Sequence, residues 1–138
     1  MSQPHRARRL ALQGLHCLDA QGAKALDLVE AFVRDSRDKT DTVESAIQML
    51  RGAYEDREAI DALIAAHARH WQLGRLAAVD RNILRLGVHE LRGRRTPPAV
   101  VITEAMRLAR EFSTAESPRF VNGILDAIAR HLRGETAE

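Results

Sequence analysis

The sequence predicts an all-α protein, and three observations support that prediction. Apolar residues recur at helical spacing along most of the chain, no segment alternates apolar and polar residues over the length of a strand, and the connections are short. The 138 residues favour one domain spanning 1–138. Because 45% of the residues are apolar, such a domain can bury a core without a metal ion or a disulfide.

Two helices are expected at the N-terminal end. The first covers about 4–20 and ends at Gly22, and the second covers about 24–37. The first helix should turn its leucines inward and carry arginines near its start. The apolar positions of the two helices are Leu10, Leu15, Leu18, Leu26, Val29, Ala31, Phe32 and Val33.

The middle of the chain predicts two more helices. Asp41 precedes Glu44 by three residues, the spacing of a reciprocal capping box, so a third helix should start there and cover about 43–51. Gly52 is expected to separate this helix from a fourth one over about 55–70. Residues 71–74 should form a tight connection.

The C-terminal half predicts three helices, and the first is central because 79–91 is apolar over a wide arc. Thr96 before Pro97 and Ser117 before Pro118 are typical helix starts, since proline suits the first helical position. The last two helices should therefore begin at these pairs, and 134–138 should fray. The residues expected to face the core are Val100, Val101, Ala105, Leu108, Phe112, Phe120, Val121, Ile124, Leu125, Ile128 and Leu132.

The charge of the chain is unevenly distributed. Lys24 and Lys39 are the only lysines among 21 basic residues, and the rest are arginines. Residues 1–18 contain three arginines and no acid, 19–61 contain eleven of the 19 acids, and 69–95 contain seven arginines. A protein of net charge +2 can thus present a positive face, and guanidinium groups bind phosphates well.

Several classes of protein are excluded. No stretch approaches the roughly 20 apolar residues that span a bilayer, and the first ten residues lack the apolar region of a secretory signal. Cys17 is the single cysteine, so an intramolecular disulfide is impossible. We therefore expect a cytoplasmic protein with no membrane partner. Aromatic residues make up 4% of the chain, too few for the base-stacking platform of an RRM.

No pattern in the sequence supports catalysis. Glycine-rich nucleotide loops are absent. His89 and Glu90 begin the pattern of a zinc-protease helix, but Gly93 stands where the second zinc ligand would be. His16 and Cys17 are adjacent in a predicted helix, so their side chains point about 100° apart and cannot act as base and nucleophile. We expect no enzymatic activity, no cofactor, and no catalytic or metal-binding residue.

Arginines cluster at the start of the first predicted helix. Arg6, Arg8 and Arg9 lie where the helix dipole disfavours cations, and an anionic partner would resolve that conflict. A solvated N-terminus is the alternative. The basic run at 92–95 is a weaker indication, because it follows a helix end where cations are favoured.

Four segments resemble the NusB family of bacterial transcription factors. They are ARRLALQGLHCLD at 7–19, VDRNILRLGVHEL at 79–91, TPPAVVITEAMRLAREFS at 96–113 and RFVNGILDAI at 119–128. The most specific pieces are FVNG, Asp80 and Arg85 in DRNILR, and ITEA where the family usually has INEA. The middle of the chain matches in length and pattern alone.

The resemblance implies a fold of about seven helices in two packed sub-bundles and a function without catalysis. The family binds the boxA sequence of nascent single-stranded RNA jointly with the ribosomal protein NusE, in the RNA polymerase antitermination complex. This supports transcription of ribosomal RNA operons. Family members are known both as monomers and as homodimers. Because phosphate contacts give affinity without sequence preference, we expect weak RNA binding alone and tighter binding with NusE.

The resemblance also implies residues for each partner. The family's first helix contacts RNA, and His16 stands where the family commonly has a tyrosine near the RNA. The matching RNA-binding positions are Arg6, Arg8, Arg9 and His16. The positions that match the surface facing NusE are Asp80, Glu116, Arg119 and Phe120, although periodicity alone would also place Phe120 in the core.

Asn122 and Gly123 of the FVNG segment are assigned mainly to structure. Glycine allows close packing between helices, and a partly buried asparagine amide needs hydrogen-bond partners.

Two other functions are open. The RNA-binding module at the N-terminus of some ribosomal RNA cytosine methyltransferases shares this fold, but there a long catalytic domain follows, and no cofactor loop follows in this chain. A helical protein-interaction adaptor without RNA binding is the second. Such an adaptor would bind NusE and leave RNA affinity unchanged.

Overall fold

The protein is helical throughout the part of the chain that the structure describes. The structure, a computed structural model, describes residues 3–68 and 76–134. These ranges contain seven α-helices, one 3-10 helix and no strand, which confirms the predicted all-α class. The elements are α1 (Gln3–Gln21), η1 (Ala23–Ala25), α2 (Leu26–Arg34), α3 (Thr40–Glu55), α4 (Arg57–His67), α5 (Ala78–Gly93), α6 (Pro98–Phe112) and α7 (Ser117–Leu132).

A few expectations fall outside those ranges. The connection predicted over 71–74 and the end of the fourth predicted helix lie outside the described residues, as does 135–138 of the tail. Of the helices that are described, none combines the length and the apolar character needed to cross a membrane.

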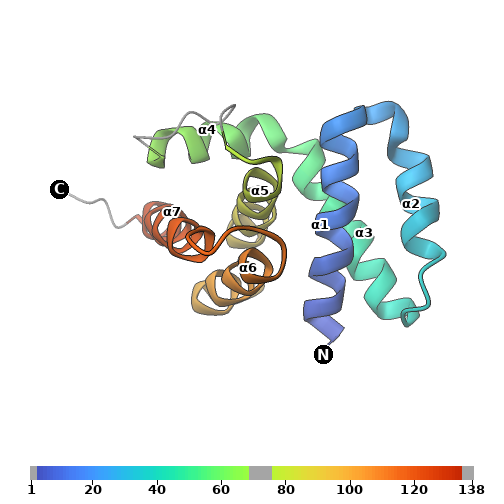
Figure 1. Cartoon of the computed structure of the whole chain (residues 1–138). Helices are drawn as coiled ribbons and strands as arrows, with labels where there is room; N and C mark the ends of the chain where they lie inside the picture. The colour runs from blue at the N-terminus through green and yellow to red at the C-terminus, as the bar shows by residue number, and fades with distance from the viewer. Residues whose placement is uncertain (1–2, 69–75, 135–138) are drawn as a thin grey trace.

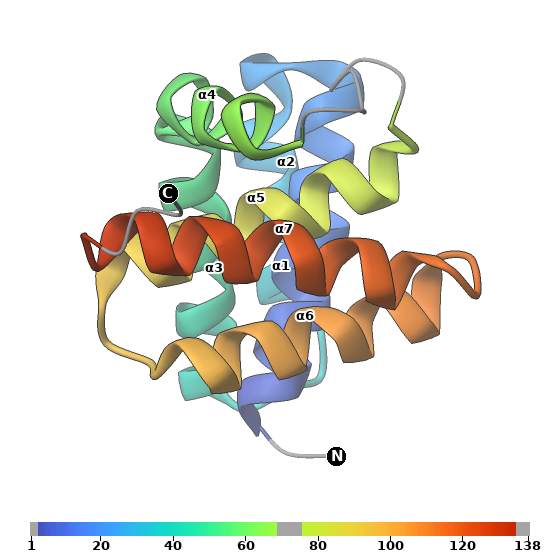
Figure 2. The ribbon, with the colours of Figure 1, turned by 90° about the vertical axis from the view of Figure 1, so that its left-hand side faces the viewer.

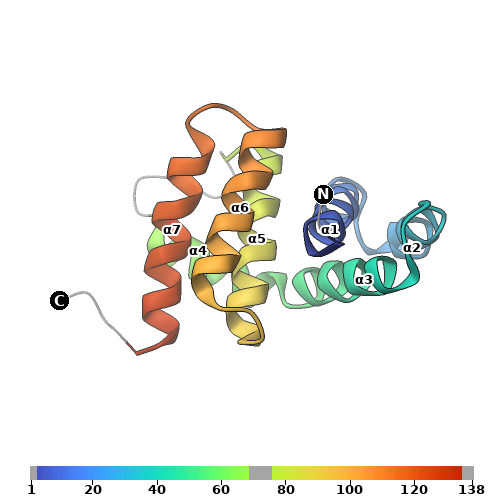
Figure 3. The same cartoon turned by 90° about the horizontal axis from the view of Figure 1, so that it is seen from below.

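The helices pack as two sub-bundles, as expected. α1, α2 and α3 lie together on one side of the molecule, and α4, α5, α6 and α7 lie on the other (Figures 1 and 3). α6 and α7 run antiparallel side by side, and both pack on α5 (Figure 2). α5 also contacts α1 and α3, so this central helix joins the two sub-bundles through one continuous core.

The first predicted helix is confirmed, and the second is shorter than predicted. α1 covers the predicted range, with Leu15 and Leu18 fully buried and Leu10 partly buried. Gly22 follows it with φ of 85°, a conformation that glycine adopts without steric penalty. The second predicted helix is a 3-10 turn followed by α2, which ends early, at Arg34.

The prediction that Gly52 breaks a helix is wrong. α3 runs without interruption through Gly52 to Glu55. A Cβ atom at Gly52 would overlap the ring of His89, which projects from α5. The glycine is therefore required by the close approach of α5 to α3, a contact between residues far apart in the sequence.

The expected helix caps are displaced by one or two residues. Asp41 lies in the first turn of α3 rather than at its N-cap, which is Lys39, so the capping box is wrong. α6 begins at Pro98 and not at Pro97, because a residue before proline is forced out of the helical region, and Pro97 has ψ of 140°. The N-cap of α7 is Glu116, which places Ser117 inside the helix.

The burial pattern follows the prediction on α7 and departs from it on α6. Val121, Ile124, Leu125 and Ile128 are buried as expected. Phe112, however, keeps 36% of its surface exposed, and Val100 keeps 44%. Val100 lies on α6 outside the arc of Val101, Ala105 and Leu108, whereas Phe112 continues that arc at the last residue of the helix.

The structural assignment of Asn122 and Gly123 is also wrong. Both residues are exposed on α7, and a Cβ atom added at Gly123 would meet no atom within 4 Å. Within the described chain, neither close helix packing nor a buried amide accounts for these two residues.

Candidate nucleic-acid and protein interfaces

Two of the three N-terminal arginines are half-exposed and form ion pairs at the surface. Arg6 Nε lies 2.7 Å from Asp38 Oδ1, and the Arg6 side chain is 51% exposed. Arg9 Nε lies 3.1 Å from Glu111 Oε2, and the guanidinium carbon is 5.5 Å from the centre of the Phe112 ring. Arg6 is thus the more exposed of the two, since the Nε atom of Arg9 is itself buried against α6.

Arg8 is different because it is buried. Its Nε and Nη2 atoms donate to the two carboxylate oxygens of Glu90, at 2.9 and 2.7 Å. Burial lowers the pKa of Arg8, but the hydrogen bond and charge of Glu90 raise it more, so the pKa lies above its ordinary value. This bidentate pair holds α1 against α5.

His5 fixes the start of α1 to α6. The ring is fully buried, with Nδ1 3.0 Å from Glu104 Oε2 and Nε2 2.5 Å from Glu111 Oε1. Glu111 therefore contacts both His5 and Arg9 through its two oxygens.

These contacts change the argument from the helix dipole. The sequence suggests that cations at the start of α1 require an external anion, but Asp38, Glu90 and Glu111 already supply negative charge there. Of the predicted RNA contacts on this turn, Arg6 and Arg9 reach solvent and Arg8 does not.

His16 lies two turns further along α1, exposed at the edge of an apolar groove. The groove has a volume of about 610 Å³ and is lined by α1, by Leu28 and Phe32 of α2, and by Val79 and Phe112. Phe32 is 63% exposed and Leu28 is 69% exposed.

The sequence contains a signal for this groove. Val29 and Val33 of α2 are buried, while Leu28 and Phe32 form a second pair at the same spacing beside them. The apolar arc of α2 is thus wider than a helix with one buried face requires.

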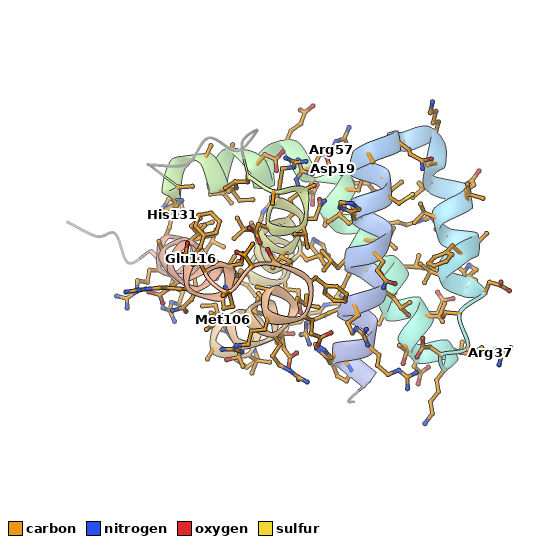
Figure 4. The ribbon with its side chains drawn as sticks, in the orientation of Figure 1. Asp19, Arg37, Arg57, Met106, Glu116 and His131 are labelled. Carbon is orange, nitrogen blue, oxygen red and sulfur yellow. The ribbon has the colours of Figure 1, made fainter. Side chains whose placement is uncertain are left out.

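The four residues predicted to face NusE line one pocket at the start of α7. Asp80, Glu116, Arg119 and Phe120 surround a hollow of about 570 Å³. Glu116 and Arg119 are exposed, and Phe120 is half-buried against the core. Figure 4 shows Glu116 on the α6–α7 side of the molecule, well apart from Arg37 on the α2–α3 connection.

Asp80 has a structural role within this pocket. Its Oδ1 accepts a hydrogen bond from Ser113 Oγ at 2.7 Å, and its Oδ2 accepts one from Ser117 Oγ at 3.1 Å. The carboxylate thereby fixes the α6–α7 connection to α5 and positions Glu116 and Arg119.

The sequence analysis missed an ion-pair cluster where α1, α4 and α5 meet. The buried Arg85 donates to both oxygens of Asp61 at 2.7 Å, and lies 3.0 Å from Asp19. Burial raises the pKa of Asp19, but hydrogen bonds from Arg81 and Arg85 lower it more, so the pKa lies below its ordinary value. Charge alternation between 19–61 and 69–95 was the available signal.

A search for metal-ligating side chains among the described residues finds no group of three or more His, Cys, Asp or Glu able to hold an ion.

Known proteins similar to this chain share its whole architecture. The model of the NusB family matches residues 5–130. The transcription antitermination protein NusB of Solibacter usitatus is 42% identical over 134 residues, which cover 96% of this chain and 92% of the relative. The NusB structure from T. maritima superposes with a TM-score of 0.84 at 33% identity, covering 94% of this chain and 92% of that one. A crystal structure of antitermination factors NusB and NusE with double-stranded RNA gives a TM-score of 0.83 at 31% identity, covering 95% and 98% of the two chains.

Proposed function

The chain belongs to the NusB family, and on that premise we propose that it is a transcription antitermination factor. It binds boxA-type single-stranded RNA together with NusE in the RNA polymerase antitermination complex and supports transcription of ribosomal RNA operons. The role is non-catalytic, in the cytoplasm, and performed by a single domain over 1–138. The observation that carries the proposal is the match over 5–130, because it includes both the arginine turn of α1 and the pocket at α7.

The exposed arginines of α1 are suited to binding phosphate. Surface ion pairs contribute about 0–1 kcal/mol, so a phosphate can replace Asp38 beside the half-exposed Arg6 at little cost. The side chain of Arg9 is 36% exposed and also reaches solvent. Breaking a buried bidentate pair costs about 3–5 kcal/mol. We therefore assign RNA contact to Arg6, Arg9 and His16, and assign to Arg8 the positioning of α1.

The pocket at the start of α7 is suited to binding a protein. Exposed charges of both signs, Glu116 and Arg119, flank the half-buried ring of Phe120. An apolar centre with a charged rim is typical of protein interfaces. We assign this pocket to NusE.

The RNA-binding assignment is tested by salt-dependent titration with a boxA-type RNA, with and without NusE. Each phosphate contact to a single strand contributes about 0.7 to the slope of log K against log salt, so Arg6→Ala and Arg9→Ala should each flatten it by about that amount. Arg130→Ala is the matched control, since Arg130 is 59% exposed and paired with Asp126 on α7. An RNA affinity that changes neither with salt nor with the α1 substitutions would contradict the assignment.

The partner assignment has its own variant. Arg119→Glu should abolish binding of NusE and leave the RNA affinity of the chain alone unchanged, because Arg119 lies in the α7 pocket and not on α1. If the wild-type chain binds NusE but binds no RNA, whether alone or together with NusE, the protein is an adaptor.

A further inference from the structure

The apolar groove over α1 is an exposed apolar feature of the described residues that neither the arginine turn nor the α7 pocket includes. Three of the four large apolar side chains that the described surface exposes, Leu28, Phe32 and Phe112, line it. Its lining residues come from α1, α2, α5 and α6, and Figure 1 shows α1 between α2 on one side and α5 and α6 on the other. Exposed apolar residues that gather at one place, and are not scattered singly, mark binding sites.

Two of these side chains, Phe32 and Phe112, are aromatic, although aromatic residues make up only 4% of the chain. The rings of Phe32 and Phe112 come from helices 80 positions apart and face the same groove, so the tertiary structure creates an aromatic surface that composition argues against. Aromatic rings on which bases can stack are the feature that proteins binding single-stranded nucleic acid share.

The edges of the groove carry polar groups on the α1 side. Gln13 and His16 are exposed there, and they offer hydrogen-bond donors and acceptors. The guanidinium of Arg9 lies over the Phe112 ring, which places a cation at the end of the groove nearest the start of α1. The groove is therefore continuous with the surface that we assign to RNA phosphates.

We propose that this groove binds unstacked bases of the single-stranded RNA whose phosphates contact Arg6 and Arg9. The inference rests on the proposed function and deepens it by locating the contacts that add to phosphate binding. A base has flat apolar faces and a polar edge, which match the aromatic walls and the polar rim formed by Gln13 and His16. At about 610 Å³, the groove has the size of sites that hold small flat molecules.

A protein segment is the competing occupant, and the position of the groove argues against it. The pocket assigned to NusE at the start of α7 shares no lining residue with this groove. Arg9 contacts a ring of the groove, and His16 lines it, so two of the three proposed RNA contacts border this site.

The test compares Phe32→Ser with wild type on two RNA oligonucleotides of equal length, one intact and one with abasic positions. Stacking of one base is worth about 1–3 kcal/mol, so Phe32→Ser should weaken binding of the intact RNA by at least about fivefold. The salt slope should not change, because no phosphate contact is lost. Binding of the abasic RNA should be the same for both proteins.

Val100→Ser is the matched control. Val100 is exposed at the start of α6, outside the groove, so the substitution removes a similar exposed apolar side chain and should leave both RNA affinities unchanged. Because Phe32 is itself 63% exposed, the Phe32→Ser variant should fold, and a thermal unfolding curve like that of wild type establishes this.

Each outcome decides the question. If wild type binds RNA with the expected salt slope and Phe32→Ser binds the intact RNA equally well, the groove proposal is overturned while the proposed function stands. If Phe32→Ser weakens binding of NusE and not of RNA, the groove is a protein site and the proposal is also overturned. If wild type binds no RNA, alone or with NusE, both proposals fail.

Discussion

Arg8 and Arg9 are adjacent in α1, but their different burial gives them different roles. Arg8 is held in a buried bidentate pair with Glu90, whereas Arg9 is half-exposed beside Glu111 and Phe112. Consecutive residues of a helix point about 100° apart, so Arg8 faces α5 and Arg9 faces α6 at the edge of the solvent. A basic cluster in a sequence therefore identifies a surface, but burial decides which of its residues can bind a ligand.

His89 predicts a pH dependence of stability. Burial lowers the pKa of His89 below its ordinary value of 6.5, and Glu90 and Asp56 only partly oppose this effect. The unfolded chain thus binds a proton more readily than the folded one between the folded-state pKa and 6.5. The stability that His89 contributes is present above about pH 6.5 and is lost as the pH falls below it.

The measurement is the free energy of unfolding in urea as a function of pH for wild type and His89→Gln. The wild-type curve should fall more steeply below pH 6.5, by at most about 1.4 kcal/mol per pH unit for one proton. His16→Gln, at an exposed site on α1, is the control. Parallel curves for wild type and His89→Gln would refute the prediction.

At the scale of elements, the fit between α3 and α5 depends on a glycine. Gly52 stands inside α3, where alanine would favour the helix by about 1 kcal/mol. A methyl group there would overlap the His89 ring, and overpacking of this kind costs about 1–3 kcal/mol. The packing cost equals or exceeds the gain in helix propensity, which accounts for glycine at this position.

Gly52→Ala should therefore lower the free energy of unfolding by up to about 2 kcal/mol, the packing cost less the gain in helix propensity. In a His89→Ala background the same substitution should be neutral or stabilising, because the ring that the new methyl group would overlap is absent. Gly123→Ala in α7 is the matched control and should stabilise by about 0.5–1 kcal/mol, because that site is open. Equal effects of Gly52→Ala in both backgrounds would show that His89 is not the cause.

Helix boundaries also depend on neighbouring residues. Seven helices and their order follow from apolar spacing, but Thr96, Asp41 and Ser117 are not the N-caps that their residue types predict. Pro98 moves the start of α6 one residue later than expected. The hydroxyl of Ser117 donates a hydrogen bond to Asp80 and does not cap its own helix. Side chains that can cap a helix can also make tertiary hydrogen bonds, and the sequence does not show which one forms.

At the scale of the whole molecule, Arg85 connects the two sub-bundles. It projects from α5 and binds Asp61 of α4 and Asp19 of α1. Hydrogen bonds to these two carboxylates raise its pKa, although burial opposes them as the largest single influence. The charge is therefore retained in the core, where its loss would remove the bidentate partner of Asp61, while Asp19 would keep Arg81.

Arg85→Met should lower the free energy of unfolding by about 3–5 kcal/mol, because removing one partner of a buried pair leaves the other uncompensated. Arg81→Met is the matched control and should cost less, since Arg81 is more exposed and Asp19 keeps Arg85. Urea unfolding followed by circular dichroism measures both. Adding Asp61→Asn to Arg85→Met should recover part of the loss, and no recovery would show that charge is not the cause.

The sequence by itself determined the helical class, the order of the helices, most of the core positions and the family, because apolar periodicity and short motifs are local properties of the chain. Tertiary structure alone decided that Arg8 is buried, that Gly52 receives the His89 ring, and that Gly123 faces outward. It also brought Phe32 and Phe112 to one groove. These outcomes depend on which helix lies opposite each residue, and the spacing of residues along one helix does not contain that information.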